Sequence, residues 1–236
     1  MIIDSEKIID LSAFKICESL TIQEYDIGVT RVFTLENFYE DFEKVHREMK
    51  KLPLCPILNS NNIDHFDGRA CYSQNMLKTE CPFVTDYRNL VSQLANVPVG
   101  RVDVDDKILF NALQFTTDWL DYKNNWYNIH RDIHKDIINK QGVVTEKSVK
   151  GYTTLILFMN KHYEEGEGFN IYNFSNEKIT ETISSKDEWK PIFSLQGKPN
   201  SGIIFNGEMP HGACISTDQF TKELRYTQVH FALIDP

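Results

Sequence analysis

The sequence predicts a mainly β protein with helices near its N-terminus and an antiparallel jelly roll in its second half. From residue 107 onward, β-branched and aromatic runs of strand length follow one another, with turn residues between them and no long helix. Before that point, two stretches place apolar residues at helical spacing. We expect one domain over residues 1–236, in which a helical and loop-rich part (1–104) packs on a jelly-roll core (105–236).

Two helices are expected in the N-terminal part. After short strands and turns in residues 1–33, apolar residues recur at helical spacing from Leu35 to Met49, which predicts the first helix. Thr34 is its expected cap, and the prolines of the following LPLCP stretch end it. The second helix is shorter and is predicted over residues 86–96.

Residues 55–83 are expected to form a loop-rich stretch between the helices. Loops of this length in a compact domain often cover or line a binding site. His65 lies in this stretch and is a candidate substrate contact.

Strands are expected in seven segments of the second half: ILFNALQFT, WYNIH, GYTTLILFM, GFNIYNF, PIFSL, SGIIFNG and ELRYTQVHFAL.

Composition excludes several classes of protein. The formal net charge of -9 argues against a general nucleic-acid binder, which usually presents a basic face to phosphates. Five cysteines without C-x-x-C spacing argue against a disulfide scaffold or a structural zinc site. The sequence shows neither a signal peptide nor a membrane-spanning apolar run. We therefore expect a cytoplasmic protein with no nucleic-acid or membrane partner.

The stretch YNIHRDIH gathers several groups that can bind a metal. In a strand, residues i and i+2 point to the same face, so His130 and Asp132 project together while Arg131 points away. The pair offers one nitrogen and one oxygen ligand from a rigid backbone. His134 lies on the same face if the strand continues, so which groups bind the metal stays open.

A third ligand has to come from elsewhere in the chain. His211, in the stretch EMPHGACI, lies far from the first pair in sequence, and a closed jelly roll can bring such segments together. Two histidines and one carboxylate form a facial triad that leaves coordination positions open and suits non-haem Fe(II).

The last predicted strand contains a candidate anion site. Arg225 and Thr227 fall on one face of this strand with Val229, and Tyr226 and Gln228 fall on the other. A guanidinium can grip a carboxylate through two hydrogen bonds, with a hydroxyl assisting. An arginine among apolar and aromatic residues needs an anionic partner.

Together these motifs resemble the Fe(II)/2-oxoglutarate-dependent dioxygenase superfamily, and most closely its prolyl-4-hydroxylase-like branch. The resemblance covers roughly residues 105–233, and EEGEGFNIYNF is similar to the glycine-rich turn of that branch. The other matching positions are Tyr127, His130 and Asp132 (Y-x-x-H-x-D), Pro199, Gly202, Phe205, His211 and Gly212 (P-x-x-G, F, H-G), and Arg225 and Thr227 (R-x-S/T). One difference is that Glu167 separates Gly166 and Gly168, which are adjacent in the family.

The resemblance implies a double-stranded β-helix and a set of roles. His130, Asp132 and His211 would bind Fe(II), while Arg225 and Thr227 would hold the distal carboxylate of 2-oxoglutarate. Tyr127 would either touch this cosubstrate or orient the ligand strand. With O2 as cosubstrate and ascorbate as a candidate activator, the expected reaction hydroxylates a C–H bond and releases succinate and CO2. Retention of Asp132 argues against halogenation. The expected substrate is a small molecule or an amino-acid side chain.

Two other functions are compatible with parts of the pattern. One is a cupin-like ligand-binding module without catalysis, against which the complete motif set argues. The other is a zinc hydrolase, which requires HRDIH to be helical so that His130 and His134 share a face. The stretch lacks the adjacent glutamate that would act as base, and the residues before it favour a strand.

Overall fold

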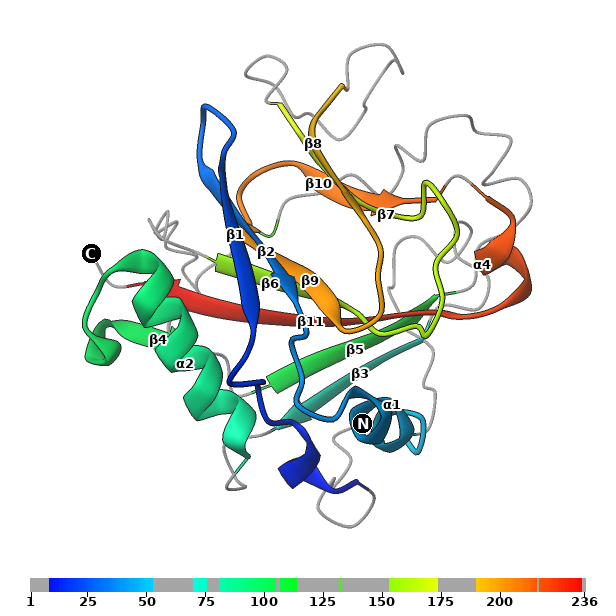
Figure 1. The fold of residues 1–236 in the computed structure, drawn as a ribbon, viewed down its shortest axis with the longest axis horizontal. Coiled ribbons are helices and arrows are strands. Elements are labelled where there is room, and N and C mark those ends of the chain that lie inside the picture. Colours follow the sequence, from blue (N-terminus) through cyan, green and yellow to red (C-terminus); the bar gives the residue numbers. More distant parts are fainter. Residues whose placement is uncertain are drawn as a thin grey trace, which may run out of the picture.

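The structure is a computed structural model of the 236-residue chain (Figure 1). It describes residues 9–52, 70–75, 81–104, 107–113, 132, 153–173, 190–215 and 217–234. The helical elements are η2 (Leu11–Ala13), α1 (Phe42–Met49), α2 (Pro82–Ala95), η4 (Val99–Arg101) and α4 (Gln219–Lys222). The strands are β1 (Thr21–Asp26), β2 (Arg31–Glu36), β3 (Ala70–Asn75), β4 (Val102–Val104), β5 (Lys107–Leu113), β6 (Thr153–Phe158), β7 (Gly168–Tyr172), β8 (Pro191–Gln196), β9 (Ser201–Asn206), β10 (His211–Cys214) and β11 (Arg225–Ile234).

Within the described residues, the strands form two antiparallel sheets. The major sheet has the order β1-β2-β9-β6-β11-β5-β3, and β4 also pairs with β11. The minor sheet has the order β10-β7-β8. Figure 1 shows the minor sheet above the long β11 strand and α2 beside β4. Strands that are distant in sequence are thus neighbours in each sheet, and the predicted jelly-roll core is confirmed.

The alternation of side chains along the major sheet creates two separate cores. On β6, Leu155 and Leu157 pack with residues of α1 and α2 in what we call the helix-side core. Ile156 and Phe158 point the other way and pack with residues of the minor sheet in the inter-sheet core. Because β6 and β9 are buried on both faces, their sequences are almost continuously apolar, whereas the edge strand β1 is exposed along its length.

The first helix begins later than its sequence pattern indicates. It starts at Phe42, not Leu35, because Leu35 belongs to strand β2, whose residues Phe33–Glu36 pair with β9. Asn37 then adopts a left-handed conformation (φ 59°), which ends the strand. The cap is Asp41, whose carboxylate accepts a hydrogen bond from the Lys44 backbone N–H at 2.9 Å, and not Thr34.

The second helix is confirmed, although it starts four residues before the predicted boundary at residue 86, at Pro82. Proline suits a first helical position, because its missing N–H would have no partner there. Asn96, in the left-handed conformation (φ 54°), ends the helix.

Six of the seven expected strand segments overlap β5, β6, β7, β8, β9 and β11, and the seventh, WYNIH, lies outside the described residues. Three described strands were not expected: β4, β10, and β3, which lies inside the predicted loop-rich stretch 55–83 and pairs with β5. Strands from both sides of residue 105 share the major sheet, so the division of the chain at this position stays a prediction.

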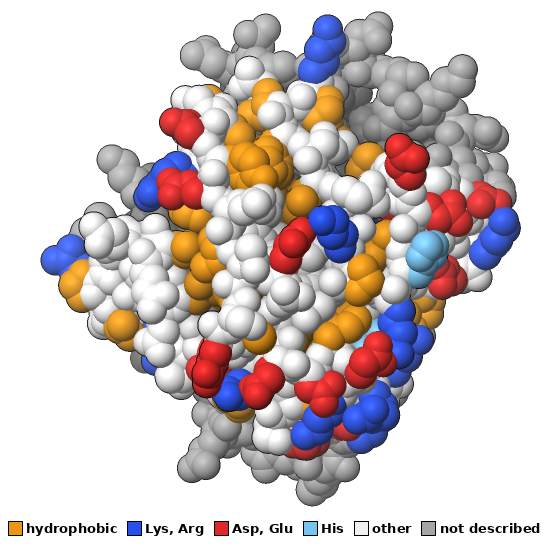
Figure 2. Space-filling view, in the orientation of Figure 1, with side chains coloured by type: hydrophobic (Ala, Val, Ile, Leu, Met, Phe, Trp, Pro, Cys, Tyr) orange, Lys and Arg blue, Asp and Glu red, His pale blue; other side chains and the backbone are white. Residues whose placement is uncertain are grey.

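The surface mixes charges of both signs. Figure 2 shows acidic and basic side chains next to each other on the face in view. The ion pairs include Lys15–Glu40 at 2.9 Å and Lys198–Glu36 at 2.7 Å. Exposed pairs of this kind contribute little stability. None of the helices in the described part of the chain has the length and apolar character needed to cross a membrane.

Candidate metal and anion site

Two of the predicted metal ligands lie beside each other. His211 is the first residue of β10, and its Nε2 atom is 3.4 Å from Oδ2 of Asp132. The Asp132 backbone N–H donates a hydrogen bond of 2.8 Å to the carbonyl of Gly207, just before β10. This bond brings the Asp132 segment against the turn that leads to His211. The long-range proximity on which the metal hypothesis depends is therefore present.

Hydrogen bonding fixes which nitrogen of His211 faces Asp132. Nδ1 lies 2.7 Å from the carbonyl oxygen of Met209. Because a carbonyl can only accept, Nδ1 donates to Met209, and Nε2 is the ring nitrogen that faces the carboxylate. The ring packs edge-to-face on Phe205, with centroids 4.7 Å apart, and also contacts Phe169. Two electron-pair donors facing each other in a buried place are suited to a cation.

Thr154 orients the carboxylate. Its hydroxyl donates a hydrogen bond of 2.8 Å to Oδ2 of Asp132, the same oxygen that faces His211. Thr154 is fully buried and lies on the inter-sheet side of β6, with Ile156 and Phe158. Sequence reasoning missed this residue. The available signal was a threonine at an inward position of an apolar strand, where its hydroxyl needs a partner.

Arg225 is buried at the start of β11. The side chain is 4% exposed, and its Nη2 atom donates a hydrogen bond of 3.1 Å to the Gly168 carbonyl. Among the described residues, its Nε atom has no hydrogen-bond partner. Burial lowers the pKa of Arg225, and interactions with Tyr163 and Glu167 oppose this change. Thr227 is also buried, two positions further along β11.

The two faces of β11 are arranged as the sequence predicts. Tyr226 packs against the helix-side core, and Gln228 accepts a hydrogen bond of 2.6 Å there from the hydroxyl of Tyr39. Val229 packs against the inter-sheet core, on the side of Arg225 and Thr227. The guanidinium therefore lies between the sheets and not at the molecular surface.

The backbone on both sides of Arg225 is held by Asn160. The Asn160 side chain donates a hydrogen bond of 2.8 Å to the Leu224 carbonyl and accepts one of 2.6 Å from the Tyr226 N–H. The hydroxyl of Tyr163 in turn accepts from the Asn160 N–H at 3.1 Å. These contacts fix the position from which Arg225 projects. Neither residue carried a recognisable sequence signal, because each acts through a long-range contact.

The strand register gives the separation between the two parts of the site. In the β10–β7 pair, His211 lies opposite Ile171 and Cys214 lies opposite Gly168. Arg225 binds the carbonyl of Gly168 on β7. Gly168 is three residues from Ile171, the β7 residue that lies opposite His211. At about 3.3 Å per residue, the guanidinium is roughly 10 Å along the strand from the His211–Asp132 pair.

Several predicted residues lie outside the described part of the chain. These are His130 and Tyr127 of the Y-x-x-H-x-D motif, His134, and His65 of the loop-rich stretch. Their assigned roles stay predictions.

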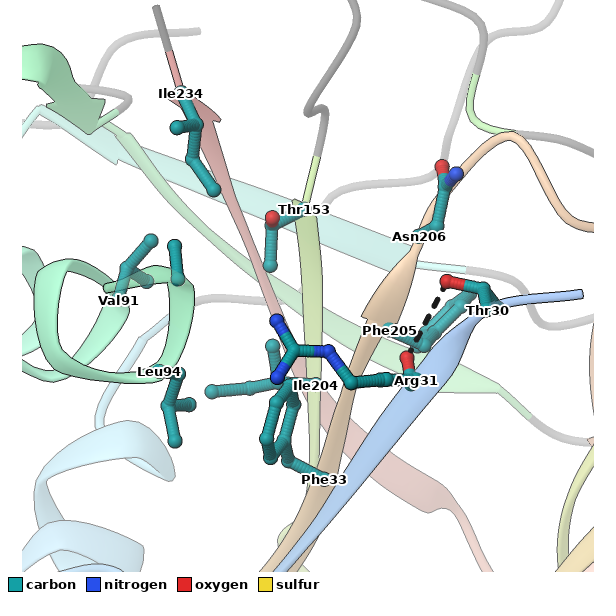
Figure 3. Close-up of a pocket in the computed structure, with 11 residues that line it drawn as sticks. Thr30, Arg31, Phe33, Val91, Leu94, Thr153, Ile204, Phe205, Asn206 and Ile234 are labelled. Atoms are coloured by element: carbon teal, nitrogen blue, oxygen red, sulfur yellow. Dashed lines mark hydrogen bonds between the residues drawn. The ribbon is translucent and has the colours of Figure 1, made fainter. Parts of the chain in front are cut away.

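A cavity of about 250 Å³ lies on the opposite face of the major sheet (Figure 3). It is lined by Val91 and Leu94 of α2 and by Phe33 and Thr153 of the sheet, while Arg31 extends across the ring of Phe33. Alternation along β6 places Thr153 toward this cavity, while its neighbour Thr154 faces Asp132. The cavity and the candidate site thus lie on opposite faces of β6, and Phe205 both lines the cavity and packs against His211.

Comparison with protein-family models and with curated proteins gave no match. Solved structures did match. HygX from Streptomyces hygroscopicus with nickel, 2-oxoglutarate and hygromycin B bound is 10% identical, with a TM-score of 0.52, over 86% of this chain and 82% of that chain. HygX with nickel and 2-oxoglutarate bound gives 9% identity and a TM-score of 0.51, over 91% and 82%. A prolyl-4-hydroxylase from Pseudomonas putida gives 11% identity and a TM-score of 0.44, over 82% of this chain and 83% of that chain. The chain thus has the HygX fold, as the motif resemblance implied.

Proposed function

We propose that this protein is an Fe(II)/2-oxoglutarate-dependent oxygenase. Its ferrous ion would be bound by Asp132, His211 and His130, and its 2-oxoglutarate by Arg225 and Thr227. The observation that carries the proposal is the 3.4 Å approach of His211 Nε2 to Asp132 Oδ2, between segments far apart in sequence. The shared fold with HygX, which was solved with nickel and 2-oxoglutarate, supports the same reading.

The donor set fits a ferrous ion. An imidazole nitrogen and a carboxylate oxygen, with a second imidazole from His130, match the facial arrangement that leaves three positions open. The Met209 carbonyl and the Thr154 hydroxyl hold the two ligands in orientation before any metal binds. Bound iron with 2-oxoglutarate would supply the activation of O2.

The Arg225 region fits the distal carboxylate of the cosubstrate. A buried guanidinium whose Nε–H has no partner among the described residues favours an anion, and Thr227 can add a hydroxyl from the same strand face. The separation of roughly 10 Å from the His211–Asp132 pair suits a short dicarboxylate that reaches the metal with its other end. Tyr127 is proposed to contact this cosubstrate or to orient the strand that carries His130.

The inter-sheet core surrounds the site with buried apolar side chains. Phe169, Ile171 and Phe205 are each at most 2% exposed. Excluding water strengthens the electrostatic interactions of the site and protects reactive species from side reactions. We propose hydroxylation of a C–H bond as the outcome, with succinate and CO2 as co-products. A small molecule or an amino-acid side chain is the proposed substrate, and the cytoplasmic location stays a prediction.

Anaerobic spectroscopy tests this proposal without knowledge of the substrate. Fe(II) and 2-oxoglutarate added to the protein under nitrogen should give the weak visible absorption band of a chelated complex. Replacing His211 with Ala should abolish the band, whereas the band should persist in a variant of the cavity on the other face of the sheet, Arg31→Gln. Absence of the band from the folded wild-type protein would contradict the proposal. If 2-oxoglutarate still binds, that result favours a ligand-binding module, and hydrolytic activity with Zn(II) would favour a hydrolase.

A further inference from the structure

Glu167, which separates the two glycines of the turn, is fully buried. Both neighbours have to be glycine: Gly166 has a positive φ of 85°, and a Cβ on Gly168 would collide with the carbonyl oxygen of Leu195. The turn therefore holds its backbone tightly and directs the intervening carboxylate into the protein. A buried carboxylate is costly unless hydrogen bonds and a nearby positive charge compensate for its lost hydration.

Both kinds of compensation are present around Glu167. Its Oε1 atom accepts hydrogen bonds from the Thr217 backbone N–H at 2.8 Å and from the Thr217 hydroxyl at 2.5 Å. The positive charge is Arg225, which donates to the carbonyl of Gly168, the residue next to Glu167, and interacts electrostatically with Glu167 without a direct ion-pair contact between the two side chains. Two buried groups of opposite charge thus lie beside the proposed cosubstrate carboxylate site.

We propose that Glu167 is the resident counter-ion of Arg225 and that it limits the affinity of this anion site for dicarboxylates. The inference rests on the proposed function and adds a residue that controls cosubstrate affinity. Before 2-oxoglutarate binds, Glu167 compensates for part of the charge of the buried guanidinium. After binding, the guanidinium faces two carboxylates, whose mutual repulsion in a poorly solvated site opposes tight binding. Glu167 acts through Arg225 and is a positioning residue.

The variant Glu167→Gln separates charge from shape. Its amide oxygen can still accept from Thr217, but the negative charge is gone. We expect 2-oxoglutarate to bind the Fe(II) protein roughly tenfold more tightly, as measured by anaerobic calorimetry, because the repulsion is removed. The thermal midpoint without 2-oxoglutarate should fall, and the increase on adding it should exceed that of the wild type.

The matched control is Thr217→Val, which removes a hydrogen bond to Glu167 but keeps the charge. It should lower the thermal midpoint without tightening 2-oxoglutarate binding. A purely structural role predicts that both variants lose stability and that neither binds more tightly. Equal or weaker binding by folded Glu167→Gln, beside normal wild-type binding, overturns this inference alone. Failure of the folded wild-type protein to bind 2-oxoglutarate overturns the proposed function and this inference with it.

If Glu167→Gln does not fold, the double variant Glu167→Gln/Arg225→Met decides the question. Removing both charges should restore folded protein if each compensates for the other, since the second change eliminates the buried cation. A double variant that also fails to fold contradicts the counter-ion role.

Discussion

The two faces of the major sheet bury different kinds of polar group. On the helix-side face of β11, an uncharged pair is buried: Tyr39 donates to Gln228. The His230 ring packs edge-to-face on Phe83 there, with centroids 4.8 Å apart. On the inter-sheet face, Arg225 and Thr227 are buried on β11, and Arg225 donates to the carbonyl of Gly168 in the minor sheet. Neutral groups are cheaper to bury than ions, so the helix-side face can serve stability alone.

Four ionisable side chains gather on the inter-sheet side of the major sheet. Asp132, His211, Glu167 and Arg225 all approach the space between the sheets, and the last three are at most 4% exposed. A buried ionic group seldom adds stability compared with an apolar residue. Such a group of buried ionisable side chains is typical of binding and catalytic sites, and the helix-side face serves as the comparison. The following variants test this distinction.

Removing a proposed metal ligand should have the largest effect. His211→Ala should reduce Fe(II) affinity and 2-oxoglutarate turnover by more than about 100-fold. Mutating a residue that only hydrogen-bonds to a metal ligand already lowers metal affinity or activity by about 10–100-fold. Fe(II) titration and succinate formation measure the two effects. His230→Gln, a change of a histidine on the helix-side face, should lower stability but leave Fe(II) affinity within about twofold. Equal loss of Fe(II) binding in both variants would remove the distinction between the faces.

Arg225→Lys keeps a positive charge and removes the planar fork of the guanidinium. We expect the dissociation constant of 2-oxoglutarate to rise by roughly tenfold or more, because a lysine cannot form the bidentate pair. Fe(II) affinity without 2-oxoglutarate should stay unchanged. Calorimetry with each ligand separates the two quantities, and an unchanged 2-oxoglutarate constant would exclude Arg225 from the cosubstrate site.

Thr153 and Thr154 are neighbours on β6 but point to opposite faces of the sheet, so substituting each in turn compares the two faces. Thr154→Val removes the hydrogen bond to Asp132 and should weaken Fe(II) binding by about tenfold. Thr153→Val alters the cavity on the other face and should leave Fe(II) binding unchanged. Competition for Fe(II) with a coloured chelator measures both. If the two variants behave alike, Thr154 does not orient the carboxylate.

The smallest effect is expected from a neutral polar contact in the helix-side core. Tyr39→Phe removes the hydroxyl that donates to Gln228 and should lower the free energy of unfolding by about 1–2 kcal/mol. Urea denaturation measures this loss. Fe(II) and 2-oxoglutarate affinities should not change, and a change in either would show that the two faces are coupled.

Local sequence pattern was sufficient for part of this account. The two-residue period of β11 predicted which of its side chains lie on the same face of the strand as Arg225. A shift of one residue in this pattern would have exchanged the two faces. The pattern was misleading at Leu35, which fits a helical repeat but lies in a strand because it pairs with β9. The roles of Thr154, Asn160 and Glu167 depend on hydrogen bonds to residues remote in sequence, which no local pattern contains.

A crystal structure of the protein grown with Fe(II) and 2-oxoglutarate under nitrogen, with anomalous data at the iron edge, tests the central claim most directly. The account predicts one anomalous peak bonded to His211 Nε2 and to the carboxylate of Asp132, with His130 as the third ligand. It also predicts the far carboxylate of 2-oxoglutarate on the guanidinium of Arg225. Iron bound elsewhere, or 2-oxoglutarate away from Arg225, would contradict it.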